Sequence, residues 1–344
     1  MKERYSSIDL LRFIAASSVA FTHLIILNSN SSLNLEIISS ISVEVFFIIS
    51  GFVLAPQIIA LAKNNNFYNY KIFLIRRWYR TIPIYILSLI LTSIILDKIF
   101  SLDFVKYLLF IQNFIFLTVK SDYFSISWSL SVEEWFYIIF PLFLIIGFKI
   151  NSFYKSINIL SLSWFFIFLI LLIRIFYVND GDWGTNIRRI VIFRLDAIVF
   201  GFILYFYKDR INFNLINFFI LIIFFLIFSK FLFEIMKLNA LQKINFYQFI
   251  FHYCVAIWGS LVVILFYLIE KMINNININK VNIFLGKISY SIYLFHLLTI
   301  YLVSSLNFSL TPTILIFILL QITISVIIYY FFEEPILKSR PTYK

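Results

Sequence analysis

Long apolar stretches recur along the whole chain, and they limit its fold more than any single motif does. A helix needs about 20 consecutive apolar residues to cross the hydrocarbon core of a bilayer. Ten stretches meet this length approximately. They are residues 8–27, 39–61, 81–97, 128–148, 157–178, 190–207, 213–233, 244–269, 283–305 and 313–332. The pattern predicts an all-α, polytopic membrane protein with about ten transmembrane helices.

The composition excludes an ordinary soluble domain. Of the 344 residues, 62% are hydrophobic and only 13% are charged, which is more apolar surface than one aqueous core can hide. The 7 Gly and 6 Pro leave little room for long loops. We therefore expect residues 1–344 to form a single transmembrane domain with no appended soluble domain. The first apolar stretch contains Arg12 and His23 and lacks a cleavage pattern, so we expect an anchor rather than a signal peptide.

The basic residues predict the orientation of the chain. Most Lys and Arg residues fall in the loops that share a side with the N-terminus, and basic loops favour the cytoplasmic face. Both termini are expected in the cytoplasm, with the protein in the cytoplasmic (inner) membrane. The net charge of +11 is spread over short loops and forms no single patch, so nucleic acid is not an expected partner. The single Cys254 excludes an intrachain disulfide.

Residues 104–118 form a shorter apolar stretch. A spanning helix here would reverse every later loop and turn most of the basic ones outward. We expect a re-entrant or interfacial segment on the outer side.

Ionisable side chains inside spans are costly, so each one is a candidate functional group. Asp9, Arg12 and His23 lie near one face of the first span, because spacings of 3 and 11 residues approach whole helical turns. Counting residues from the loops places five ionisable groups of five spans in one outer layer. These are His23, Glu44, Glu133, Asp196 and His296. Such a layer would suit a polar reaction chamber.

A basic cluster precedes the third span. Arg76, Arg77 and Arg80 lie within five residues, and three guanidinium groups can bind phosphate. The same residues also suit a simple cytoplasmic anchor with interfacial aromatics, so both interpretations stand.

Several sequence strings, in order, resemble the integral-membrane acyltransferase family often called acyltransferase type 3. The strings begin with I-D-L-L-R-F-I-A-A and a later His, then F-F-I-I-S-G-F and R-R-x-x-R. The most specific is W-S-L-S-V-E-E-W-F-Y-I-I-F-P at 128–141. R-L-D-A-I-V-F-G, S-Y-S-I-Y-L-F-H and E-E-P follow, so the resemblance covers almost the whole chain.

The resemblance implies an O-acyltransferase, most often an O-acetyltransferase, that moves an acyl group from acyl-CoA to a glycan or lipid-linked saccharide. His23 would be the catalytic histidine, Arg12 its functional partner, and Glu133 a supporting carboxylate. Arg76, Arg77 and Arg80 would meet the phosphates of CoA, which is a co-substrate; no bound cofactor and no metal are expected. Candidates for supporting or substrate-contacting roles are Asp9, Glu44, Ser129, Ser131, Asp196 and His296.

The residues themselves are compatible with this chemistry. Acyl transfer to a hydroxyl needs a base near neutral pKa, and histidine fits. A nearby carboxylate such as Glu133 could fix the histidine tautomer. Two other classes of function remain open. A transporter or flippase would also place charges in the membrane, although no inverted repeat is visible. A structural or sensory protein would need no chemistry at His23.

Overall fold

The computed structural model describes residues 4–28, 33–64, 67–154, 158–177, 183–210, 215–237, 245–272 and 276–342. All regular structure in these ranges is helical, which confirms the all-α prediction. Helices suit such apolar segments because lipid offers no partner to backbone N–H and C=O groups, and a helix satisfies them internally.

The α-helices follow one another along the chain. They are α1 (Ser6–Asn28), α2 (Leu33–Asn64), α3 (Phe67–Ile95), α4 (Leu102–Leu108), α5 (Ser127–Tyr154), α6 (Ile159–Tyr177), α7 (Leu195–Tyr207), α8 (Leu215–Lys237), α10 (Asn245–Met272), α11 (Ile276–Ser304), α12 (Leu310–Ile328) and α13 (Glu334–Lys338). Three short turns of other helix types are η1 (Gly184–Arg188), η2 (Val191–Phe193) and η3 (Tyr329–Glu333).

Nine helices within the described ranges are long and apolar enough to cross a membrane. They coincide with nine of the ten predicted stretches, and the protein is a multi-pass membrane protein. The tenth stretch, 190–207, differs. Its helix α7 has 13 residues and begins only at Leu195, after the π turn η1 and the 3-10 turn η2. It is therefore shorter than the predicted span.

The chain packs as two compact units. The first comprises residues 1–49, 207–243 and 250–335, and the second comprises 50–206, 244–249 and 336–344. Whether residues 1–344 act as one transmembrane domain stays a prediction.

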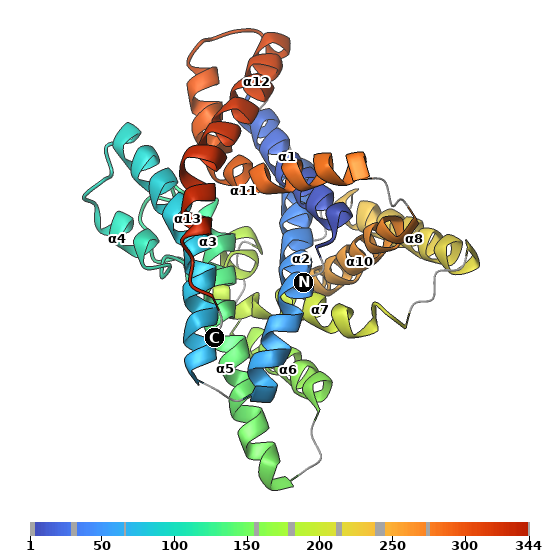
Figure 1. Ribbon diagram of the computed structural model, residues 1–344. Coiled ribbons are helices and arrows are strands. Elements are labelled where there is room, and N and C mark those ends of the chain that lie inside the picture. Colours follow the sequence, from blue (N-terminus) through green and yellow to red (C-terminus); the bar gives the residue numbers. More distant parts are fainter. Residues whose placement is uncertain are drawn as a thin grey trace. The chain divides into compact units, whose positions relative to one another are not determined.

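In the first unit, α1 packs along α11, and α11 packs against α12 (Figure 1). The approach of α1 is very close at Gly286. A Cβ atom at this position would overlap the Cβ of Asp9, so only glycine lets the two helices meet there.

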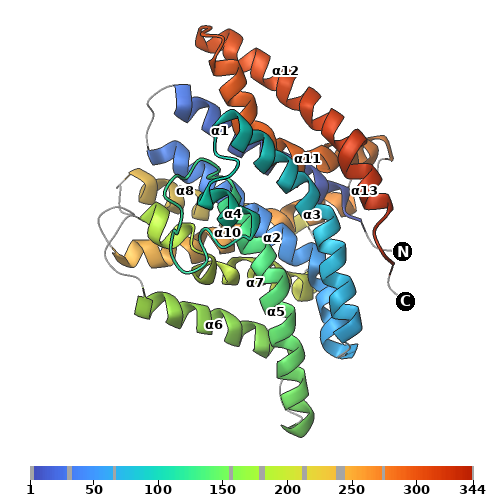
Figure 2. The ribbon, with the colours of Figure 1, turned by 90° about the vertical axis from the view of Figure 1, so that its left-hand side faces the viewer.

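In the second unit, α5 contacts both α3 and α6, and the short α4 lies beside α3 (Figure 2). The C-terminal half of α2 approaches α7 closely. A Cβ atom at Gly51 would collide with the backbone carbonyl of Ile198 and the backbone nitrogen of Phe202. Gly51 therefore lies at a backbone-to-backbone helix crossing.

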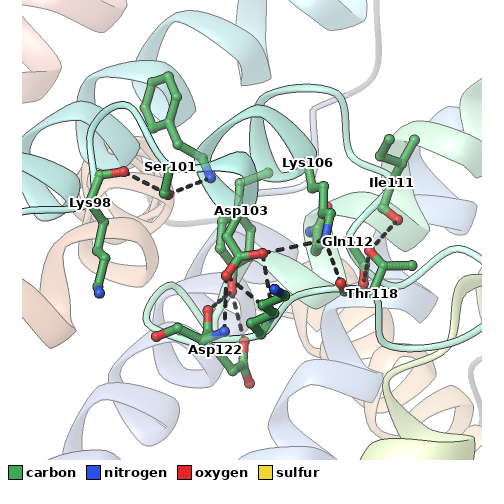
Figure 3. A network of polar contacts seen from close by, with 12 residues as sticks. Lys98, Ser101, Asp103, Lys106, Ile111, Gln112, Thr118 and Asp122 are labelled. Carbon is green, nitrogen blue, oxygen red and sulfur yellow. Dashed lines mark hydrogen bonds and ion pairs between the residues drawn. The ribbon is translucent and has the colours of Figure 1, made fainter.

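A hydrogen-bonded connection joins α3 to α5. Asp103 lies at its centre (Figure 3), where its carboxylate accepts the backbone N–H of Lys120 and of Ser121 and pairs with Lys106 at 3.4 Å. The seven-residue α4 confirms that 104–118 is not a spanning helix. Burial alone would raise the pKa of Asp103. The N–H groups of Ser121 and Lys120 and the charge of Lys106 outweigh burial and hold the pKa below its usual value.

The connection continues into contacts with the start of α5. The Gln112 amide donates to the Ser127 hydroxyl at 3.0 Å, and the Asn113 amide donates to the carbonyl of Trp128 at 3.2 Å. Phe110 adopts a left-handed conformation with φ 56°, and its carbonyl accepts the Trp135 indole N–H. These bonds fix the N-terminal turn of α5, which carries the W-S-L-S-V-E-E-W string.

We expect Gly51→Ala to lower the free energy of unfolding by about 1–3 kcal/mol, because backbone atoms cannot yield to the added methyl group. Gly147→Ala is the matched control. Its Cβ would meet only the flexible end of the Leu162 side chain. Thermal unfolding of the detergent-solubilised protein measures both, and equal melting temperatures for the two variants would contradict the crossing.

The Asp103 carboxylate predicts a pH dependence. Because folding lowers its pKa, its stabilisation is complete above the unfolded value of about 3.9 and is lost as the pH falls through the folded value. Asp103→Asn mimics the protonated acid, so we expect the Lys120 and Ser121 amides to exchange with deuterium about tenfold faster at neutral pH. Asp97→Asn changes an exposed acid of the same connection and is expected to leave them unchanged. Unchanged exchange in Asp103→Asn would refute this role.

Candidate functional site

Two histidines meet where α1 packs on α11. The His23 Nδ1 atom lies 2.7 Å from the His296 Nε2 atom, and the two rings are nearly parallel at 10°. His296 is fully buried, whereas His23 is partly exposed. The structure therefore brings together two of the five ionisable groups predicted in the outer layer.

Each histidine has a further partner at its other ring nitrogen. The His23 Nε2 atom lies 3.4 Å from the hydroxyl of Ser39, a buried residue of α2. The His296 Nδ1 atom lies 2.7 Å from the backbone carbonyl of Tyr293, three residues earlier on the same helix. A hydroxyl, two imidazoles and a carbonyl thus form one continuous chain, which we call the histidine relay: Ser39, His23, His296 and Tyr293.

Arg12 lies three helical turns from His23 on α1. Its guanidinium is 3.4 Å from the Asp9 carboxylate, which also binds Arg4 at 2.7 Å. Asp9 is the residue that faces Gly286 on α11. Asp9 and Arg12 thus form an ion pair, which their spacing of three residues on one helix permits. The functional role predicted for Arg12 stays a prediction.

Glu44 has a different histidine partner. Its carboxylate lies 3.8 Å from His252 Nδ1 of α10, and both residues are buried. His252 is not among the candidates chosen from the sequence, where only its depth in the stretch 244–269 suggests a polar role. The depth of a residue along a helix can be counted from the sequence, but the sequence does not show which face of α10 contacts α2.

In the second unit, Glu133 accepts hydrogen bonds from the hydroxyls of Ser50 and Tyr137. Its neighbour Glu134 is buried and accepts from Thr81 of α3. Because the two acids are adjacent on α5, they face different neighbours. The support that Glu133 would give to a reaction centre stays a prediction.

The arginine cluster is divided between buried and accessible side chains. Arg76 donates to the backbone carbonyl of Pro341, and Arg77 donates to Gln57 at 3.0 Å and lies over the Phe73 ring. Both are buried, while Arg80 is partly exposed. The three guanidinium groups therefore do not form one open clamp.

The remaining candidates have structural contacts. Asp196 forms a fully buried ion pair with Arg174 at 2.8 Å. Ser131 donates to the Ser127 carbonyl at 3.2 Å, and Ser129 makes a long 3.4 Å contact with the Ile126 carbonyl. No three His, Cys, Asp or Glu side chains in the part of the chain that the structure describes are grouped so as to hold a metal ion.

The histidine relay is the arrangement with the clearest chemical potential. An imidazole held at one nitrogen by an acceptor and facing a hydroxyl with the other can act as a general base. The sequence indicates His23 and His296 as candidates but not Ser39, because a lone serine on an apolar helix has no signal of its own.

Known proteins are similar in sequence to parts of this chain. A family model described as an acyltransferase domain matches residues 5–331. An uncharacterised Haemophilus influenzae protein is 36% identical over 143 residues, which are 37% of this chain and 58% of that protein. A Bacillus subtilis protein named "Putative peptidoglycan O-acetyltransferase YrhL" is 28% identical over 41% of this chain and 24% of its own length.

A Staphylococcus aureus protein named "Putative O-acetyltransferase" is 26% identical over 60% of this chain and 35% of its own length. The matches therefore span less than two thirds of these relatives. No solved structure matches the chain. Because the family model covers nearly every residue, the protein belongs to the acyltransferase type 3 family of integral-membrane proteins.

Proposed function

We propose that the protein is a membrane-bound O-acyltransferase of the cytoplasmic membrane. It moves an acyl group, most simply acetyl, from acyl-CoA to a hydroxyl of a cell-envelope glycan or lipid-linked saccharide. The observation that carries the proposal is the His23 imidazole, which is hydrogen-bonded on one side and faces a hydroxyl on the other. Family membership supports it, as do the two relatives whose names read "Putative peptidoglycan O-acetyltransferase" and "Putative O-acetyltransferase".

The reaction needs one base and no redox step. The oxygen of the acceptor hydroxyl attacks the thioester carbonyl, and His23 accepts the proton of that hydroxyl. The new C–O bond forms, the C–S bond breaks, and the proton passes from His23 to the leaving CoA sulfur. His23 is neutral again at the end, so each transfer restores the enzyme.

The exposure of the three arginines decides which of them we assign to the phosphates of acyl-CoA. Phosphate groups need guanidinium donors that are not already used inside the protein. Arg76 and Arg77 are buried against protein acceptors, whereas Arg80 is partly exposed. Arg80 is therefore the member of the cluster proposed to meet the phosphates of CoA, with Arg76 and Arg77 shaping α3 around it.

We expect His23→Ala to reduce glycan acetylation by about 10²- to 10⁴-fold at equal membrane abundance, because the base is lost. Mass spectrometry of envelope polysaccharide measures the acetyl increment in cells with the wild type, the variant or no gene. His252→Gln is the matched control, since it alters a histidine that lies outside the histidine relay.

Acetylation that persists in His23→Ala would refute the catalytic assignment. A glycan that crosses the membrane in a gene-dependent way without acyl-CoA, and carries no added acyl group, would instead identify a transporter or flippase.

Arg80→Ala is expected to raise the KM for acyl-CoA about 10- to 100-fold with little change in kcat, as the loss of one charge-assisted phosphate contact predicts. Arg77→Ala is expected to lower thermal stability instead, because Arg77 binds Gln57 and interacts electrostatically with the buried Glu134. Lys71→Ala removes an exposed charge of the same helix and serves as the control. Initial rates over a range of acetyl-CoA concentrations separate a change in KM from a change in kcat. An unchanged KM in Arg80→Ala would exclude the contact between Arg80 and the CoA phosphates.

A further inference from the structure

We propose that His296 is a positioning residue that fixes the tautomer of His23, so that the Nε2 atom of His23 is the base and the side facing Ser39 is the reacting side. The inferred effect on acyl transfer rests on the proposed function, whereas the tautomer itself follows from the hydrogen bonds of the histidine relay alone.

The tautomer of His296 is set by a backbone carbonyl. The His296 Nδ1 atom is 2.7 Å from the Tyr293 carbonyl oxygen, which can only accept a hydrogen bond. The proton of His296 must therefore lie on Nδ1. Since His296 is fully buried among apolar helices, the neutral ring is favoured and its Nε2 atom has a free lone pair.

The tautomer of His23 follows from that lone pair. The His296 Nε2 atom, 2.7 Å away, can accept but not donate, so the Nδ1 atom of His23 must carry the proton. The lone pair of neutral His23 then lies on Nε2, which points at the Ser39 hydroxyl. A free histidine interconverts between its two tautomers. Here the backbone carbonyl of Tyr293 on α11 determines which ring nitrogen of His23 on α1 carries the lone pair.

The contact with Ser39 is suited to replacement by a substrate. Its 3.4 Å separation is longer than the usual range for a hydrogen bond, so little is lost when another hydroxyl takes the place of Ser39. The contact with His296 is short, and the fully buried ring of His296 holds it in place. The short contact with His296 orients the imidazole of His23, and the long contact with Ser39 marks the side from which the acceptor hydroxyl approaches.

The relay also stabilises the charged intermediate. When His23 accepts a proton at Nε2 it becomes an imidazolium, and its Nδ1–H still donates to the neutral His296 acceptor. In serine hydrolases the equivalent orienting contact is worth about 10⁴ in kcat when its loss permits the wrong tautomer. A comparable effect is expected here, although a neutral acceptor replaces the carboxylate.

The experiment uses the full-length protein with ¹⁵N-labelled histidine in lipid nanodiscs. The chain has 3 histidines, so each ring nitrogen can be assigned by single substitution. We expect NMR to show protonated Nδ1 and unprotonated Nε2 in both His23 and His296. In His296→Phe, which keeps a ring but removes the acceptor, the proton of His23 is expected to redistribute to Nε2. His296→Gln retains an acceptor oxygen and is expected to preserve the wild-type tautomer.

The kinetic test uses the same two variants, His296→Phe and His296→Gln. We expect His296→Phe to lower kcat about 10²- to 10⁴-fold with a KM for acetyl-CoA that changes less than about threefold, and His296→Gln to stay within about tenfold of the wild type. A proton on Nε2 of His23 in the wild type, or an unchanged kcat in a stable His296→Phe, would overturn the proposal. If the tautomers are as expected but no variant, including the wild type, transfers an acyl group, the proposed function fails and the positioning role of His296 survives.

Discussion

The close packing of α1 against α11 is the contact on which the candidate site depends. Gly286 lets Asp9 approach the backbone of α11, and further along the same pair of helices His23 meets His296. A side chain at 286 would push the helices apart, and a hydrogen bond of 2.7 Å between two rings tolerates little displacement. The geometry of the His23–His296 pair is therefore a property of one helix interface.

Several buried ionisable side chains have a polar partner inside the protein. Asp196 is neutralised by Arg174, Glu44 lies beside His252, and Glu134 accepts a hydroxyl. Each arrangement lowers the cost of a polar group in an apolar interior. His23 differs because one of its nitrogens contacts the buried imidazole of His296 and the other lies 3.4 Å from the hydroxyl of Ser39.

The proposed activity combines a family assignment with this local chemistry. Membership in an acyltransferase family restricts the reaction class, and the base that such a reaction needs is proposed to be His23 of the histidine relay. The arginine cluster shows that neighbouring members of one motif can differ in burial and in their contacts. Arg80 is partly exposed, while Arg76 and Arg77 are buried and bind protein groups.

The sequence by itself determined the helical class, nine of the candidate spanning segments, the absence of a spanning helix at 104–118 and the candidacy of His23 and His296. These depend on local hydropathy and on the cost of polar groups in lipid, both of which are readable along one helix. Only the tertiary structure decided the partners: Ser39 for His23, His252 for Glu44 and Arg174 for Asp196. The physical reason is that these helices are apolar on every side, so hydropathy does not reveal which face turns towards another helix.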